Sequence, residues 1–184
     1  MEDEKIIELY NQRNEKAIAE TADKFGKMLF SIAMNILSVR EDSEETVSDT
    51  YVKAWDNIPP QFPNSLGAWL GKITRNLSIS RLRKNKAQKR SGIEVMLSEL
   101  EECVPSFADT EKEAESTEIA AALNSWLNMQ SREDRILFVR RYWYGDSVAK
   151  LSEKADIPAK KLSSKLFRLR KNLKNHLEEE GIFI

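Results

Sequence analysis

Apolar residues recur at intervals of three and four along most of the chain, which is the spacing of one face of an α-helix. The first clear stripe consists of Phe25, Met28, Leu29, Ile32, Ala33, Ile36 and Leu37. Similar stripes follow as far as the C-terminus, and no alternating strand pattern of useful length interrupts them. The pattern therefore predicts an all-α fold.

Two further helices are predicted in the first half of the chain. One covers about 42–57, and the other covers about 65–86. Between them, Pro59, Pro60 and Pro63 predict an extended loop, because proline lacks an amide donor and restricts the residue before it. Together with the first stripe, these helices predict a helical domain over 1–90.

The composition changes between 91 and 117. Acidic residues crowd this segment, Lys112 is its single basic residue, and apolar residues become sparse after Val104. We therefore predict an acidic flexible linker over 91–117. A second small helical domain is predicted over 118–184, where the helical spacing returns.

The totals limit the classes of protein to which the chain can belong. Its 184 residues include 29 basic and 30 acidic side chains, and no apolar run approaches the roughly 20 residues that cross a bilayer. The N-terminus lacks the order of a signal peptide. With Cys103 and His176 as the only residues of their types, an internal disulfide, a zinc site and a catalytic triad are not expected. We expect a cytoplasmic protein with no metal, no other cofactor and no direct membrane insertion.

The segment DSVAKLSEKADIPAKKLSSKLFRLRKNLK, residues 146–174, predicts a helix-turn-helix. Ser147 is suited to cap a short first helix, and Asp156 and Pro158 are suited to the turn. In the second helix, leucines at positions 162, 166, 169 and 173 share the face directed to the core.

The other side of that second helix carries cations, hydroxyls and one aromatic ring. Such a face can enter a major groove, where cations meet phosphates and shorter groups reach base edges. A solvated basic face on an ordinary amphipathic helix is the alternative. The turn spacing and the place of Phe167, off the leucine stripe, favour duplex DNA.

Two other charged segments differ in sign. The basic run RLRKNKAQKR at 81–90 follows Arg75 and Asn76, a combination suited to single-stranded nucleic acid, although basic helix ends also complement the helix dipole. The acidic segment EDSEETVSDTYVKAW at 41–55 mixes carboxylates with apolar residues, and some of these acids stabilise the helix N-terminus. Its surface predicts a protein partner rather than DNA.

Three blocks in this order resemble the extracytoplasmic-function sigma factors, the small sigma subunits of bacterial RNA polymerase in the sigma-70 superfamily. They are EDSEETVSDTYVKAWDNI, AWLGKITRNLSISRLRK and SREDRILFVRRYWYGDSVAKLSEKADIPAKKLSSKLFRLRKNL. The resemblance covers nearly the full length. It implies that 1–90 is sigma region 2 and that 118–184 is region 4, a helix-turn-helix domain that binds the −35 promoter element.

The resemblance also implies roles for particular residues. The side chains expected to dock on the clamp helices of the largest subunit of core RNA polymerase are Asp42, Glu45, Val47, Ser48, Asp49 and Tyr51. Those expected to bind the melted −10 element are Phe62, Arg75, Asn76, Arg81, Arg83 and Lys84. Those expected to bind the −35 duplex are Lys160, Lys161, Ser163, Ser164, Lys165, Phe167, Arg168 and Lys171.

The chain departs from the family pattern at a few of these places. Ser48 stands where glutamine is common, and Ser80 stands where aspartate is common. Lys160, Lys161 and Leu162 replace a common Gly-Thr-Val. The contacts at these positions are therefore expected to differ from those of other members.

The resemblance implies a promoter-specificity subunit with no catalytic residue and no small-molecule substrate, regulated by an anti-sigma factor. One alternative is a helix-turn-helix regulator that acts without core polymerase, but it would not explain the first two blocks. Another is a nuclease with a metal on the acidic helix. Its carboxylates lack suitable partner ligands, because the one histidine lies near the C-terminus.

Overall fold

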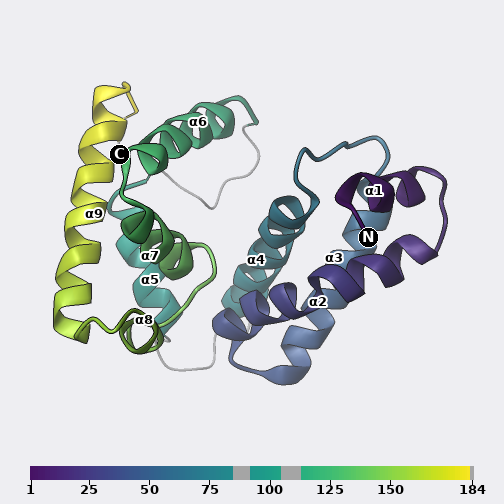
Figure 1. The fold of residues 1–184 in the computed structure, drawn as a ribbon, viewed down its shortest axis with the longest axis horizontal. Coiled ribbons are helices and arrows are strands. Elements are labelled where there is room, and N and C mark those ends of the chain that lie inside the picture. The colour runs from purple at the N-terminus through teal and green to yellow at the C-terminus, as the bar shows by residue number, and fades with distance from the viewer. Residues whose placement is uncertain (85–91, 105–112, 183–184) are drawn as a thin grey trace. The chain divides into compact units, whose positions relative to one another are not determined.

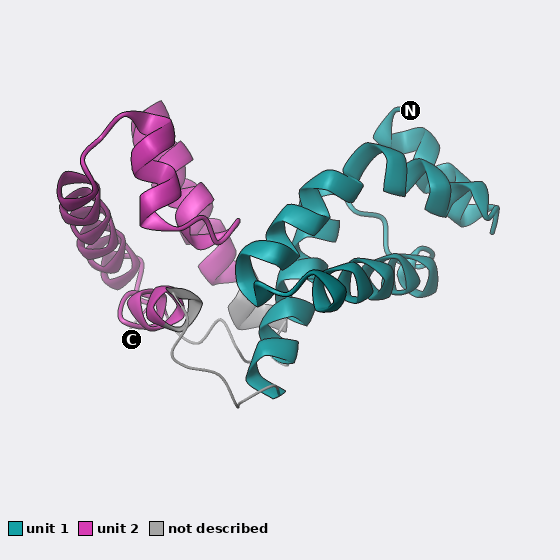
Figure 2. Ribbon diagram, turned by 90° about the horizontal axis from the view of Figure 1, so that it is seen from below, with its two compact units in different colours: residues 1–88 teal, residues 89–184 magenta. Residues whose placement is uncertain are grey.

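The computed structural model describes residues 1–84, 92–104 and 113–182, and these residues form nine helices and no strand (Figure 1). The all-α prediction is thereby confirmed for the described residues. The chain divides into two compact units, Met1–Gln88 and Lys89–Ile184 (Figure 2). Each unit is described by itself.

Unit 1 contains four helices: α1 (Asp3–Asn11), α2 (Lys16–Leu37), α3 (Arg40–Asn57) and α4 (Leu66–Lys84). The apolar stripe of α2 buries Leu29, Ile32, Ala33 and Ile36, and α2 packs against each of the other three helices. The predicted helices at 42–57 and 65–86 correspond to α3 and α4, with ends that differ by two residues or fewer.

Small hydroxyl side chains line the contact between α3 and α4. The buried hydroxyls of Thr50 and Thr74 lie 2.9 Å apart, and Thr46 and Ser78 donate to carbonyls of their own helices. Because each of these buried hydroxyls has a hydrogen-bond partner, its burial does not incur the free-energy cost of an unsatisfied polar group. These short side chains let the two helices approach closely, which places the end of α4 beside the acidic face of α3.

Unit 2 contains five helices: α5 (Gly92–Glu101), α6 (Glu113–Met129), α7 (Arg132–Tyr142), α8 (Val148–Ala155) and α9 (Ala159–Glu179). Trp126 is fully buried, and its ring packs edge-on against Phe138 with centroids 4.8 Å apart. Phe138 in turn contacts Tyr142 at 4.7 Å. The long helix α9 packs against α6, α7 and α8.

Helix α5 corrects the prediction of a flexible linker throughout 91–117. It packs against α7 and buries Met96 and Leu100, and the turn after it buries Cys103 and Val104. These four residues recur at helical spacing, a signal that the acidic composition of the segment obscured. The part of the predicted linker at 105–112 lies outside the described residues, and α6 begins at Glu113.

Candidate functional site

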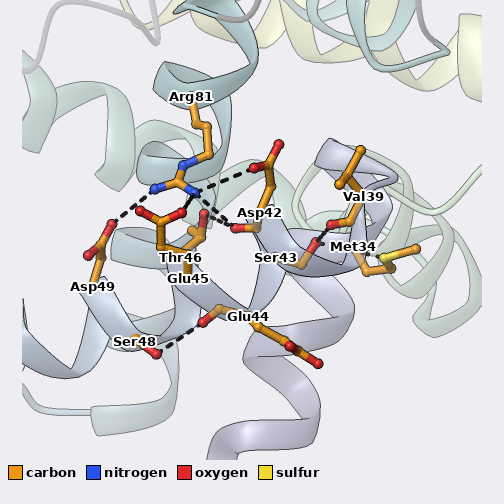
Figure 3. Close-up of polar contacts among 10 residues, drawn as sticks. All are labelled: Met34, Val39, Asp42, Ser43, Glu44, Glu45, Thr46, Ser48, Asp49 and Arg81. Atoms are coloured by element: carbon orange, nitrogen blue, oxygen red, sulfur yellow. Dashed lines mark hydrogen bonds and ion pairs between the residues drawn. The ribbon is translucent and has the colours of Figure 1, made fainter.

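The acidic face of α3 surrounds a single guanidinium from α4 (Figure 3). Nη1 of Arg81 lies 2.6 Å from Oε2 of Glu45 and 3.7 Å from Oδ1 of Asp42. Its Nη2 lies 3.5 Å from Oδ2 of Asp49. These four residues, called the Arg81 cluster below, join three predicted polymerase contacts to one predicted DNA contact.

The charges of the Arg81 cluster stabilise one another at an accessible place. The hydrogen bond and the charge of Arg81 lower the pKa of Glu45, and the same hydrogen bond raises the pKa of Arg81. The side chains of Glu45 and Asp49 are 65% and 51% exposed. The cluster borders an open groove of about 420 Å³, which Leu77, Ser80 and Lys84 also line. A partner molecule can therefore reach the carboxylates.

The other predicted docking residues of α3 lie in different environments. Tyr51 is half-buried, and exposed Ser48 donates its hydroxyl to the Glu44 carbonyl at 3.1 Å. Val47 is only 8% exposed, because it belongs to the face of α3 that packs into unit 1. Its side chain therefore offers little surface to a partner, and its contact with the polymerase stays a prediction.

The predicted −10 residues differ widely in exposure. Phe62 is 66% exposed in the loop before α4. Nearby, the indole N–H of Trp69 donates to Oε1 of Gln61 at 3.2 Å. Asn76 is half-buried further along α4. The loop thus offers an accessible aromatic ring, which a stacked base requires.

Arg75 is the most enclosed of the predicted −10 residues. Its side chain is 3% exposed, and burial lowers the pKa of its guanidinium to about 10. Its contact with a nucleic acid strand stays a prediction, and in this structure the side chain lies in the interior of unit 1. Exposed cations remain in the last turn of α4, at Arg83 and Lys84, and the predicted basic residues beyond them lie outside the described residues.

The helix-turn-helix prediction is confirmed in unit 2. The Ser147 hydroxyl caps α8 by accepting the amide N–H of Lys150 at 3.1 Å. Asp156 ends the helix in the left-handed conformation with φ 53°, which aspartate tolerates better than most residues. Pro158 then precedes α9.

Helix α9 separates an apolar face from an exposed polar one. Leu162, Leu166, Leu169 and Leu173 are all buried, as their spacing predicts. The exposed predicted −35 residues are Lys160, Lys161, Ser163, Ser164, Phe167, Arg168 and Lys171. Lys165 lies to one side, where its Nζ pairs with Oδ1 of Asp134 at 2.7 Å. Phe167 is 57% exposed, which leaves an aromatic ring in the middle of the polar face.

A second ionic cluster joins α5, α7 and α9, and sequence reasoning missed it. Oε2 of Glu99 lies 3.3 Å from Nη1 of Arg170 and 3.6 Å from Nη2 of Arg141. Arg170 donates to the Tyr142 hydroxyl at 2.6 Å, and that hydroxyl donates to Glu99 at 3.1 Å. The two arginine side chains are only 6% and 12% exposed. This Glu99 cluster attaches α5 to the other helices of unit 2.

Asp146 is a further buried carboxylate at the start of the helix-turn-helix. Its Oδ2 lies 2.6 Å from Nη2 of Arg140, and its Oδ1 lies 2.7 Å from Nζ of Lys150. Burial alone would raise the pKa of Asp146, but hydrogen bonds from Lys150 and Arg140 outweigh it and lower that pKa. Asp146 therefore stays ionised and holds the end of α7 to the start of α8.

The described residues contain no group of three or more histidine, cysteine, aspartate or glutamate side chains placed to bind a metal ion. None of their helices is long and apolar enough to span a membrane.

Comparison with known proteins adds independent information. Residues 22–88 match the family model of sigma-70 region 2. The chain is 21% identical over 180 residues to the "ECF RNA polymerase sigma factor SigW" of Bacillus subtilis, covering 95% of this chain and 96% of that one. It is 28% identical over 150 residues to the "Probable RNA polymerase sigma factor RfaY" of Xanthomonas campestris pv. campestris, covering 80% of this chain and 37% of that relative. The chain thus spans little more than a third of the second protein.

Among solved structures, one match is the "Structure of CnrH in complex with the cytosolic domain of CnrY". The TM-score is 0.45 at 19% identity, over 96% of this chain and 97% of that one. The region 2 match falls on α2, α3 and α4, and the last two of these helices build the Arg81 cluster. The similarity to SigW extends through the helix-turn-helix as well. This chain is therefore similar to extracytoplasmic-function sigma factors of the sigma-70 family, and its residues 22–88 match region 2 of that family.

Proposed function

We propose that the chain is an alternative sigma factor, which binds core RNA polymerase and directs it to promoters with −10 and −35 elements. The observation that carries this proposal is the match of 22–88 to sigma-70 region 2. A regulator that binds duplex DNA without polymerase would have a helix-turn-helix but no reason to carry region 2. In this role the chain supplies specificity in the cytoplasm, and the polymerase supplies catalysis.

We propose that the acidic face of α3 docks on the clamp helices of the largest polymerase subunit. Support comes from the exposure of Glu45 and Asp49, and from the open groove beside them. Charged faces of this kind steer association and select partners through complementary charge. Half-buried Tyr51 would add apolar contact at the edge of the same face.

We further propose that the loop before α4 and the end of α4 bind the melted −10 strand. Exposed Phe62 can stack on a base, a contact that contributes roughly 1–3 kcal/mol per base. That gain offsets the few kcal/mol needed to extrude a base from the duplex. Arg83 and Lys84 would bind the strand's phosphates, and Asn76 would read a base edge.

For the −35 element, the proposal places α9 in the major groove. The lysines and Arg168 on its exposed face would bind phosphates, while Ser163, Ser164 and Phe167 would reach base edges. Such an interface loses affinity steeply with salt, because each neutralised phosphate releases counterions. We also propose an anti-sigma factor as the regulatory partner, as the family resemblance implies.

The first experiment mixes the purified chain with bacterial core RNA polymerase and follows the complex by gel filtration. The test variant is Asp49→Arg, which reverses one charge of the proposed docking face. The control is Asp56→Arg, an equal change at an exposed position near the end of the same helix. We expect the wild type and the control to co-elute with the enzyme, and the Asp49 variant to bind at least ten-fold more weakly.

Failure of the wild type to co-elute, while it still binds duplex DNA, would leave the polymerase-independent regulator as the better explanation. If the two charge reversals weaken binding equally, the docking face is not centred on the Arg81 cluster. Run-off transcription from a library of promoters would then identify the sequences that the bound chain selects.

A further inference from the structure

Arg81 lies between two surfaces to which the proposed function gives different partners. The carboxylates of the polymerase-docking face hold its guanidinium. Yet Arg81 belongs to the basic last turn of α4, together with Arg83 and Lys84. Figure 3 shows how the side chain reaches from α4 to the acidic residues of α3. Arg81 thus neutralises carboxylates of the proposed polymerase-docking face. While it does so, it is not available to the proposed DNA-binding surface at the end of α4.

The contacts of Arg81 are of a kind that another cation can replace. Two of its three carboxylate partners are more than half exposed, and the groove beside them is open. Ion pairs at water-exposed positions contribute little net free energy, because water solvates the separated charges almost as well. The Arg81 side chain is itself only 21% exposed, but its exposed carboxylate partners can accept a cation from a partner in its place, so the exchange leaves no carboxylate unpaired.

We propose that Arg81 is an exchangeable cation that couples polymerase docking to DNA binding. In the free chain it occupies the carboxylates that a cation of the polymerase takes on docking. Docking releases the guanidinium, which then binds a phosphate of the melted strand. The inference depends on the proposed function and adds a link between its two steps.

Thermodynamic linkage makes this coupling reciprocal. If docking increases the affinity for the melted strand, then the strand increases the affinity for polymerase by the same factor. Exposed ion pairs contribute up to about 1 kcal/mol, which corresponds to about a five-fold change in affinity. The expected coupling is modest, but its sign is informative. Loss of Arg81 should strengthen polymerase binding, whereas loss of an ion pair that only supports the docking face would weaken it.

The test compares Arg81→Gln with Lys84→Gln, which removes an equal charge from the same groove three residues away. We expect Arg81→Gln to bind core polymerase about two- to five-fold more tightly than the control, in the absence of DNA. An Arg81→Lys variant, which keeps the charge but not the forked geometry, should fall between the wild type and Arg81→Gln. Thermal unfolding of each variant checks that the fold is intact.

A second measurement follows a fluorescent −10 single strand. For the Arg81→Gln holoenzyme, we expect weaker binding and a salt-dependence slope smaller by about 0.7, the value for one lost phosphate contact. The free chain should show no such loss, because Arg81 is already occupied. If Arg81→Gln binds polymerase no more tightly than Lys84→Gln, the coupling is refuted. If the wild type does not bind polymerase at all, the proposed function itself fails. That result differs from refutation of the coupling, in which the wild type binds polymerase but Arg81→Gln binds no more tightly than Lys84→Gln.

Discussion

Each unit contains a cluster of paired opposite charges, and these two clusters differ in how far their side chains are exposed to water. In unit 1, two of the three carboxylates around Arg81 are more than half exposed, whereas in unit 2 the arginines around Glu99 are almost fully enclosed. An exposed pair is nearly neutral for stability, but a buried charge that loses its partner is costly. The first cluster is therefore suited to exchange partners, and the second is suited to fix one arrangement.

This difference assigns the two clusters to different tasks. The Arg81 cluster can open when a partner arrives, since the loss of one ion pair is small beside the contacts of a protein interface. The Glu99 cluster cannot open without leaving Arg141 and Arg170 largely buried and without their shared carboxylate. Helix α5 is thus a structural part of unit 2, although the composition of its surroundings is that of a linker.

The largest expected effect comes from Glu99→Gln. It leaves the two arginines without their carboxylate, and we expect unit 2 to lose about 2–4 kcal/mol of unfolding free energy. Native-state hydrogen exchange of amides in α7 and α9 measures unit 2 separately from unit 1. The matched control is Glu102→Gln, a neighbouring acid that is exposed. Equal protection in the two variants would contradict a structural role for the Glu99 cluster.

The thiol of Cys103 tests the attachment of α5 by a different signal. Burial raises the pKa of Cys103 from 9.0 to about 11, so the neutral-pH thiolate fraction falls about 100-fold. We expect an aromatic disulfide reagent to react with the native chain at least 100-fold more slowly than with the chain in urea. Glu99→Gln should raise the native rate if it loosens α5. A native rate equal to the unfolded rate would show that the turn after α5 is open.

The sequence predicted most of the fold because hydrophobic spacing carried the signal. The leucine stripe of α9, the Ser147 cap and the turn at Asp156 all follow from local chemistry that neighbouring residues determine. The missed elements depend on tertiary contacts. Met96 and Leu100 had the spacing of a buried face, but only their partners on α7 show that the face is used.

The candidate site shows the same limit. Residue type and family position identified the acids of α3, but they could not show that Arg75 and Val47 lie inside the unit. Residue type and family position also could not show the pairing of Arg81. It was expected to bind the −10 strand, but it pairs with carboxylates of the proposed polymerase-docking face. Nothing distinguished Glu99 from the other acids of its segment, because its importance comes from two arginines more than forty residues further along the chain.

A smaller effect is expected for Asp146→Asn. Arg140 and Lys150 remain partly exposed, so they can be solvated when the carboxylate is lost, and the cost is about 1–2 kcal/mol. Because the pKa of Asp146 is lowered in the folded chain, its contribution is present above the unfolded pKa of roughly 3.9. That contribution disappears as the pH falls through the lower, folded value. Acid unfolding of unit 2 should therefore be less steep in the variant, and an unchanged acid profile would contradict this role.

The smallest effect on stability is expected for Glu45→Gln. The carboxylate is 65% exposed, and water replaces the lost ion pair to Arg81, so the thermal midpoint of unit 1 should match that of the wild type. Binding to core polymerase should nevertheless weaken, and Asp56→Asn should change neither quantity. If Glu45→Gln instead destabilised unit 1 as strongly as Glu99→Gln destabilises unit 2, both clusters would be structural. The contrast between an exchangeable cluster and a fixed one would then disappear, because an ion pair that the fold requires is not available to a partner.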